Sequence, residues 1–315
     1  MKHFVVQKEL ATTANGRILV CRDKITKQLV VVKRALTMRR NHVTRRLGGD
    51  DIRLEKEVHR VISANAGHVH IVRLLDTFVD EGYVNLVLEY CPRGELYDAV
   101  RRSPPTLTRA CDYFVQVTSA VAFVHSRGYA HGDISLESIY LDANDQCKLG
   151  DFGLAAPLDA QRSVSVGKLF YMAPEMLGAG GYFPGPADVW ALGILLFVLL
   201  TGSPLCRRAH PADTAYSFFA AHGIEGITRA WKLDDTITPD ARGLLSQMLN
   251  VDPLHRPTMD AVLAHDYVRQ GILAHKASSR LGTPSTPRSY ERMWRRLVGF
   301  TTALSPTASK PPKTC

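Results

Sequence analysis

The spacing of apolar and polar side chains changes along this sequence. Residues 4–33 alternate apolar and polar positions around turn signals, as short antiparallel strands do, and residues 83–90 form a similar run. Residues 51–66 carry apolar positions at helical spacing. After Pro92 the pattern is mainly helical. Helices are expected at residues 95–103, 107–127, 186–201, 214–222, 239–249 and 258–265. This order predicts an α+β fold, in which a small antiparallel β lobe with one main helix joins a larger, mainly helical lobe.

The helical pattern fades near Val268, and residues 277–287 are rich in Ser, Thr and Pro, as linkers and disordered stretches are. We therefore expect one domain over residues 1–270, followed by a tail over 271–315. Within the domain, the small lobe is expected at 1–90 and the large lobe at 91–270. The apolar run at 191–200 is about half as long as a membrane span, so it predicts a buried helix.

The net charge of +9 is concentrated in the tail, which holds eight Lys or Arg and one acidic residue after position 275. The six cysteines show no paired spacing, which indicates a reducing compartment, and the first residues lack the pattern of a signal peptide. These features favour a cytoplasmic protein, with the nucleus as the alternative.

The tail contains one amphipathic stretch. Residues 289–304 place apolar side chains near one helical face and arginines on the rest. A basic amphipathic helix of this kind binds an acidic membrane surface, a calmodulin-like protein or the surface of its own domain. No recognised nucleic-acid module accompanies the charge, so specific nucleic-acid binding is not expected.

Two aspartates carry the most informative chemistry. Asp133 lies in a His-x-Asp loop within residues 129–138, and Asp151 opens an Asp-Phe-Gly turn. Phosphoryl transfer divides its work between two such carboxylates: one orients the attacking hydroxyl, and the other holds a metal that bridges the ATP phosphates. An Ala-Pro-Glu motif follows at 173–175, and Lys33 ends a β-branched run upstream.

With these motifs in this order, residues 4–268 resemble the eukaryotic protein kinases. The resemblance implies a two-lobed protein-kinase-like fold of the Ser/Thr type. It also implies transfer of the ATP γ-phosphate to Ser or Thr hydroxyls of protein substrates, with Mg²⁺, or Mn²⁺ as an alternative ion. The family's roles carry over to this sequence position by position, and several positions depart from the family pattern.

For the phosphate end of the nucleotide, the resemblance implies that Lys33 pairs with a helix glutamate. Glu57 is the better candidate and Glu55 the second, and the two cannot share a helix face because they are two residues apart. Gly16 falls on the third position of the glycine-rich loop, whereas Ala11 and Thr13 replace the first two glycines.

For adenine and ribose, the resemblance implies a slot formed by residues from both lobes. Its members are Leu10, Ile18 and Val31 as the roof, Glu89 and Cys91 as the hinge, Tyr140 as the floor, and Glu95 beside the ribose and a basic substrate side chain. Val31 and Tyr140 are bulkier than the family's usual residues. The tyrosine either stacks on adenine or fills its place. Glu95 has a second interpretation, as a helix-start glutamate favoured by the helix dipole.

The catalytic loop departs from the family at two positions that bear on regulation and metal binding. Gly132 replaces the arginine that clamps a phosphate on the activation segment, so phosphorylation of Ser163 or Ser165 is not expected to be required. Ser138 replaces the asparagine that holds a second metal, and its hydroxyl is a shorter and weaker ligand.

Two further positions look exchanged. Ser135 stands where the family has a lysine near the γ-phosphate, and Lys168 stands where it has a threonine that bonds to the catalytic aspartate. We expect Lys168 to supply the missing cation near Asp133 from the opposite side. The alternative is a solvent-facing loop lysine and an unrelated serine.

The resemblance also implies structural roles in the large lobe and the core. Asp188 would brace the catalytic loop, and Arg256 would pair with Glu175 in a buried ion pair. His131 and Phe152 would stack in a core spine with Leu74 and Val61. The substituted positions leave one alternative function, a pseudokinase that acts as a scaffold or allosteric partner. They are Ala11, Thr13, Val31, Gly132, Ser138 and Tyr140.

Overall fold

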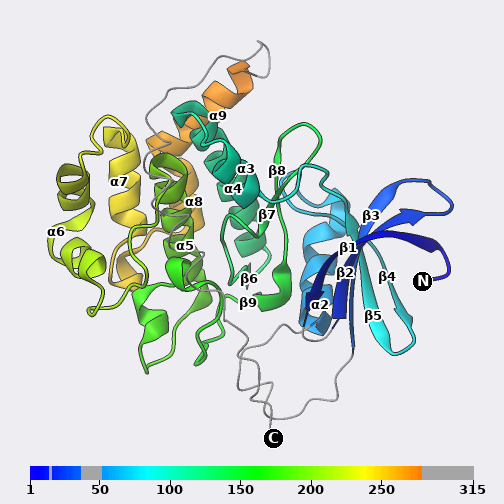
Figure 1. Ribbon diagram of the computed structural model, residues 1–315. Helices are drawn as coiled ribbons and strands as arrows, with labels where there is room; N and C mark the ends of the chain where they lie inside the picture. The colour runs from blue at the N-terminus through cyan, green and yellow to red at the C-terminus, as the bar shows by residue number, and fades with distance from the viewer. Residues whose placement is uncertain (14–15, 37–51, 279–315) are drawn as a thin grey trace, which may run out of the picture.

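The first part of the chain forms an antiparallel sheet of five strands, with one helix packed beside it (Figure 1). A computed structural model describes residues 1–13, 16–36 and 52–278. The strand order is β1-β2-β3-β5-β4. The elements are β1 (Phe4–Thr13), β2 (Gly16–Asp23), β3 (Leu29–Leu36), α2 (Ile52–Ser63), β4 (Leu74–Asp80) and β5 (Tyr83–Glu89). The predicted small β lobe with one main helix is confirmed.

Strand β3 lies at the centre of this sheet. Val30 and Val32 are buried, as the β-branched run predicts for a strand inside a sheet. Lys33 pairs in register with Ile18 on β2 and with Leu86 on β5. The strand therefore holds Lys33 on a rigid support between two neighbours.

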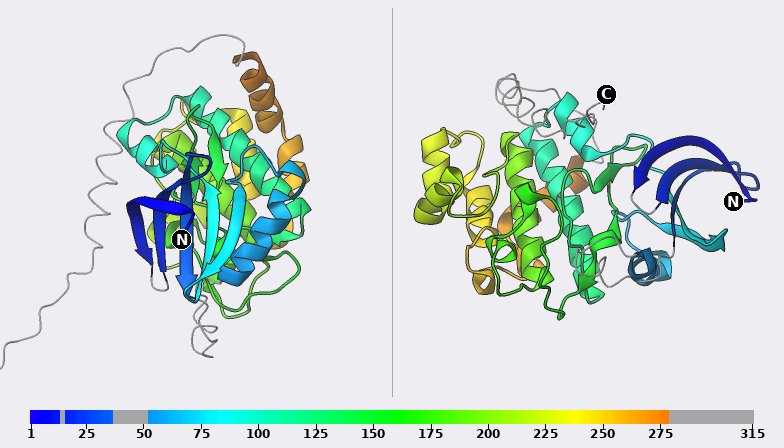
Figure 2. Two further views of the ribbon diagram at one scale, coloured as in Figure 1. Left: turned by 90° about the vertical axis from the view of Figure 1, so that its right-hand side faces the viewer. Right: turned by 60° about the horizontal axis from the view of Figure 1, so that its bottom comes forward.

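The second part of the chain is mainly helical (Figure 2). Its helices are α3 (Leu96–Arg102), α4 (Leu107–Ser126), α5 (Pro184–Thr201), α6 (Thr214–Trp231), α7 (Pro239–Met248), α8 (Met259–Ala264) and α9 (Asp266–Ser278). Among the described helices, α5 alone has the length and apolar composition to cross a membrane, and nearly all of its residues are buried in the core. The apolar run at 191–200 thus forms the buried helix that the sequence predicts.

Two helices differ from the prediction. The helix expected at 214–222 meets Gly223, whose φ of 65° breaks the helical geometry, but α6 continues after this kink to Trp231. Helix α9 was not predicted, and it runs past the expected domain boundary at residue 270. The amphipathic stretch at 289–304 lies outside the described residues.

Two short ladders hold the loops between the lobes. Strand β6 (Tyr129–Ala130) pairs with β9 (Ala156–Pro157), and β7 (Ile139–Leu141) pairs with β8 (Cys147–Leu149). The segments 131–138 and 150–155 leave these ladders, so both Asp133 and Asp151 lie next to paired backbone. Single-turn helices occupy residues 64–66, 152–154, 169–171, 174–177 and 253–255.

A buried ion pair joins the Ala-Pro-Glu turn to the end of the large lobe. Arg256 donates from Nη1 and Nη2 to the two carboxylate oxygens of Glu175, at 2.6 and 2.7 Å. The same guanidinium donates to the carbonyls of Asn250 and Pro186, and the Arg256 side chain is fully buried. Such a fork-to-fork pair is strong and geometrically specific. The predicted pairing of Arg256 with Glu175 is therefore confirmed.

Removing Arg256 should destabilise the fold much more than removing a surface arginine. Arg256→Ala leaves the Glu175 carboxylate without its buried partner, so we expect the free energy of unfolding to fall by about 3–5 kcal/mol. Arg242→Ala is the matched control: Arg242 pairs with the exposed Asp234 at 3.3 Å and should cost under about 1 kcal/mol. Urea unfolding measures both. Equal losses in the two variants would contradict the structural role of Arg256.

Candidate active site

Three charged side chains meet where the two lobes face each other. Lys33 Nζ lies 2.9 Å from Glu55 Oε1 and 2.9 Å from Asp151 Oδ1. Burial disfavours the ammonium, but the two carboxylates outweigh it and raise the pKa of Lys33. Burial likewise favours the neutral acid at Asp151, but Lys33 outweighs it and lowers the pKa of Asp151. Lys33 and Asp151 are therefore both charged at neutral pH.

The prediction that Glu57 pairs with Lys33 is wrong, and Glu55 takes this place. Helix α2 turns one face toward the core, and Glu57 lies outside this face and is exposed. The buried positions of the helix are Ile52, Glu55, Val58, His59 and Ile62. Their spacing of three and four residues is the sequence signal that distinguishes the two glutamates.

Replacing Glu57 by Glu55 moves the assignment of α2 by two residues, and this also changes the predicted core spine. His59, rather than Val61, packs against Phe152, with ring centroids 4.9 Å apart, and His131 contacts Phe152 at 4.8 Å. His59 is fully buried, and neither of its ring nitrogens has a hydrogen-bond partner among the described residues. Burial, with a smaller effect of Lys33, lowers the pKa of His59 to about 3.

Asp188 of α5 holds the backbone of the catalytic loop through hydrogen bonds. Its carboxylate accepts hydrogen bonds from the backbone N–H groups of His131 at 2.6 Å and Gly132 at 2.9 Å. Asp188 also contacts His125 Nε2 at 2.9 Å, and His131 Nε2 contacts the carbonyl of Gly150 at 2.9 Å. The predicted bracing role of Asp188 is confirmed, and the bond to Gly150 ties this loop to the residue before Asp151.

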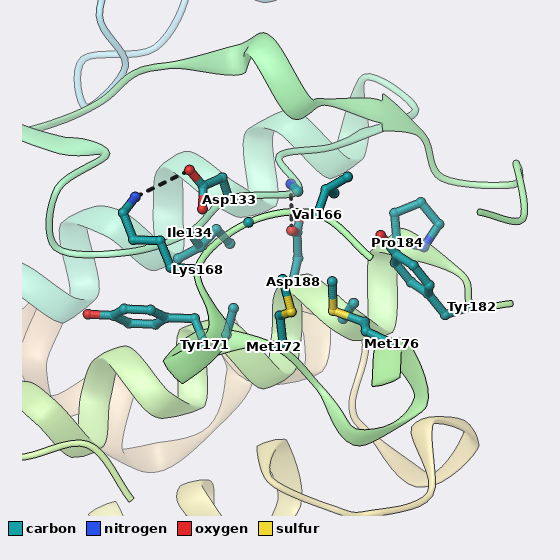
Figure 3. A pocket seen from close by; sticks show the side chains of 14 residues that line it. Asp133, Ile134, Val166, Lys168, Tyr171, Met172, Met176, Tyr182, Pro184 and Asp188 are labelled. Atoms are coloured by element: carbon teal, nitrogen blue, oxygen red, sulfur yellow. Dashed lines mark hydrogen bonds and ion pairs between the residues drawn. The ribbon is translucent and has the colours of Figure 1, made fainter. Parts of the chain in front are cut away.

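The two positions that looked exchanged in the sequence are in contact. Lys168 Nζ lies 3.3 Å from Asp133 Oδ2 and donates to Ser135 Oγ at 3.0 Å (Figure 3). Ser135 is fully buried. The other carboxylate oxygen of Asp133, Oδ1, is buried and has no hydrogen-bond partner among the described residues. One oxygen of Asp133 is thus held by a cation, and the other makes no hydrogen bond to the described residues.

Lys168 and Asp133 also line a pocket between the catalytic loop and the turn that precedes α5 (Figure 3). Met172, Met176 and Tyr182 form much of its apolar wall. The pocket therefore combines one charged edge with an otherwise apolar lining.

Ser138 is committed to the loop itself. Its hydroxyl donates to the Ser135 carbonyl at 3.0 Å and accepts from the Ser135 N–H at 3.0 Å, and Ser138 is almost fully buried. Within the described parts of the chain, no three His, Cys, Asp or Glu side chains gather as a metal cluster. Asp151 remains partly exposed, and its φ of 61° turns it into the left-handed region. Asp151 suits one hard cation such as Mg²⁺, whereas a metal-ligand role for Ser138 stays a prediction.

The residues assigned to the adenine slot surround one apolar cluster. Val31 pairs in register with Leu88, and both belong to a cluster that includes Cys91 and Tyr140. The Tyr140 ring also comes within 3.0 Å of the point where a Cβ on Gly150 would lie. Tyr140 thus packs against this cluster and beside Gly150, and burial raises its pKa, whereas its role as the floor of the slot stays a prediction.

The other residues predicted for the slot have different surroundings. Ile18 is partly buried on β2, Leu10 is half exposed on β1, and the Glu89 carboxylate is bound by Lys148 at 2.8 Å. Glu95 forms a backbone bridge with Tyr140, and burial together with Asp98 and Glu137 raises the pKa of Glu95.

The structure explains why position 16 is a glycine, which the sequence alone did not. It pairs with Ala35 across β2 and β3, and a Cβ at position 16 would lie 1.8 Å from the Arg34 carbonyl oxygen. A side chain at this position would therefore push the two strands apart. The turn residues 14–15 lie outside the described residues.

Comparison with known proteins agrees with this geometry. Residues 4–268 match the family model described as the protein kinase domain. The maternal embryonic leucine zipper kinase of Danio rerio is 32% identical over 284 residues, which cover 86% of this chain and 38% of that protein. The NUAK family SNF1-like kinase 1 of Mus musculus is 30% identical over 306 residues, covering 95% and 43%. The Aurora kinase of Schizosaccharomyces pombe is 29% identical over 269 residues, covering 84% and 71%. This chain spans less than half the length of the first two relatives.

The buried, neutral His59 should make stability depend on pH. In the unfolded chain this histidine takes up a proton below its ordinary pKa of about 6.5, whereas the folded ring stays neutral down to about 3. Its contribution therefore lowers the free energy of unfolding as pH falls through this window, by about 2 kcal/mol at about pH 5.

Urea unfolding of the wild type and of His59→Leu, at about pH 7.5 and about pH 5, measures this contribution. The stability difference between the two proteins should shift in favour of the variant at the lower pH. His222→Leu is the control, because His222 is exposed and should produce no such shift. A difference between wild type and His59→Leu that does not change with pH would refute the assignment.

Proposed function

Because the chain belongs to the protein kinase family, we propose that it transfers the γ-phosphate of ATP to serine or threonine hydroxyls of protein substrates. One observation carries this proposal above the others. Asp133 has one carboxylate oxygen beside the Lys168 ammonium and a second oxygen that is buried and unpartnered. A carboxylate held in this way is prepared to accept a substrate hydroxyl.

Protein kinases use ATP and Mg²⁺, and the residues of this site fit both. The nucleotide would lie between the β3 strand and Tyr140, with its phosphates near Lys33. Mg²⁺ would be held by Asp151 and would neutralise charge on the phosphates. Lys33 would keep its pairing with Glu55, which fixes the ammonium relative to α2. Mn²⁺ is the alternative ion, since a single carboxylate ligand places few demands on geometry.

In this arrangement three residues have separate tasks. The Asp133 carboxylate accepts the hydrogen bond of the substrate hydroxyl and orients its oxygen for attack. Lys168 holds Asp133 Oδ2 and places a positive charge beside the reacting groups, where negative charge spreads over the transferring phosphoryl oxygens. Ser135 positions the Lys168 ammonium through its hydroxyl.

The alternative function, a pseudokinase that acts as a scaffold, is supported by two features of the site. The Ser138 hydroxyl is used by the loop, and the Tyr140 ring occupies space under the adenine slot. Against it stand the ion cluster around Lys33 and the prepared Asp133. These are the groups that phosphoryl transfer requires, so transfer is the function favoured here.

The substrate class, the partners and the location of the protein are also proposals. Glu95, beside the slot, favours protein substrates with basic side chains. The basic tail is proposed to contact an acidic membrane surface or a calmodulin-like protein, and the protein to act in the cytoplasm. No specific nucleic acid is proposed as a partner.

Transfer of labelled γ-phosphate from ATP to a generic basic protein tests the proposed function. The wild type should transfer phosphate with Mg²⁺ or Mn²⁺, and Asp133→Asn should lose about 10²- to 10⁴-fold in rate, as expected for loss of a general base. Thermal unfolding with and without nucleotide is the control, since both proteins should be stabilised by ATP. Equal rates for the two proteins would contradict the role of Asp133. Absence of transfer by the wild type with either ion would favour the scaffold function.

A further inference from the structure

The catalytic loop approaches the segment after the Asp-Phe-Gly turn more closely than any side chain would allow. Gly132 has a φ of 79°, and a Cβ at this position would lie 2.4 Å from the Leu154 carbonyl oxygen. Residues other than glycine rarely adopt this φ, and the contact would force the backbone apart. Position 132 is therefore closed to an arginine, or to any other side chain, in this conformation.

A cation nevertheless lies at this point, and it comes from the activation segment. Arg162 Nη1 donates to the Leu154 carbonyl at 2.6 Å. The same nitrogen is 3.4 Å from the place that a Cβ on Gly132 would take. The guanidinium thus sits where a side chain from position 132 would begin, and it bonds the carbonyl that excludes one.

The backbone around Arg162 is anchored on the large lobe. The Arg162 N–H donates to the Tyr182 carbonyl at 2.9 Å, and the Tyr182 N–H donates to the Arg162 carbonyl at 2.8 Å. Tyr182 is buried, and its hydroxyl donates to the Val164 carbonyl at 3.3 Å. Because both ends of the arginine are held, its side chain links Leu154 to the residues just before α5.

The two candidate phosphorylation sites contribute nothing to this link. Ser163 is exposed next to Arg162. The Ser165 hydroxyl donates to the Met176 carbonyl, so a phosphate there would remove an existing bond. The conformation of residues 154–165 is thus fixed by contacts among unmodified groups.

We propose that Arg162 is a positioning residue that holds the activation segment against the catalytic loop and makes phosphorylation of the segment unnecessary. This inference rests on the proposed function, because it concerns the segment that carries Lys168 to Asp133. Arg162 keeps Leu154, which follows the Asp-Phe-Gly turn, in a fixed position relative to Tyr182, which lies just before α5. A displacement of reacting groups by about 1 Å can cost up to about a hundredfold in rate, so the brace acts on kcat rather than on nucleotide binding.

Four variants test this role. Arg162→Ala removes the bond to Leu154, Arg162→Lys can restore one donor, Gln161→Ala is the matched control, and Ser163→Ala removes the exposed candidate phosphorylation site. Gln161 lies next to Arg162 and donates to the Gly180 carbonyl, without contacting Leu154. Two readouts are used: the steady-state kcat and KM for ATP, and hydrogen exchange of the backbone amides in residues 154–165.

Arg162→Ala should lower kcat by about tenfold to a hundredfold with KM for ATP unchanged, and should speed amide exchange in residues 154–165. Arg162→Lys should recover part of both, whereas Gln161→Ala and Ser163→Ala should behave as the wild type. Wild-type exchange in Arg162→Ala, or loss of activity in Ser163→Ala, would overturn the proposal. Exchange does not require turnover, so a faster-exchanging Arg162→Ala in a protein without transfer activity would refute the proposed function and leave the brace standing.

Discussion

A buried ammonium needs carboxylates around it, and Lys33 draws its two from different parts of the molecule. Glu55 comes from α2 and Asp151 from the turn after β8, and both lie 2.9 Å from Lys33 Nζ. The buried Glu55 carboxylate would be unstable without the lysine, and burying the lysine would be costly without the two carboxylates. The cluster therefore fixes how the sheet, its helix and the large lobe face each other. The same placement of α2 brings His59 into edge-to-face contact with Phe152.

The catalytic loop keeps the charges that phosphoryl transfer requires but takes them from other positions in the chain. Ser135 offers a hydroxyl, and Lys168 brings its ammonium to both Asp133 and Ser135. Gly132 offers no side chain, and Arg162 brings a guanidinium to the neighbouring carbonyl. In both cases the activation segment supplies the cation. The two substitutions in the loop are therefore matched by two residues of the segment, and the local charge is preserved.

Much of the fold could be predicted from the sequence, because it depends on local patterns. The strands around Lys33, the buried helix at 191–200 and the spacing from Asp133 to Asp151 all follow from periodicity and motif order. The glutamate of α2 was assigned wrongly from the motif, which favoured Glu57. The three-and-four spacing of the buried positions of α2 points to Glu55, and the packing of the helix confirms that Glu55 faces inward. Arg162 was missed because its contact with Leu154 depends on the folded path of the activation segment, which no short-range pattern encodes.

The most direct test of this account is a swap of the two exchanged residues, measured by phosphate transfer from ATP at saturating substrate. Lys168→Thr alone should lose about 10²- to 10³-fold in kcat, as expected when a charge-stabilising group is removed, whereas Ser135→Ala should lose little. The double variant Lys168→Thr with Ser135→Lys should recover at least about tenfold, because a lysine at 135 would return the cation to Asp133. A double variant that folds and binds nucleotide but is no faster than Lys168→Thr would contradict the claim that Lys168 supplies this charge.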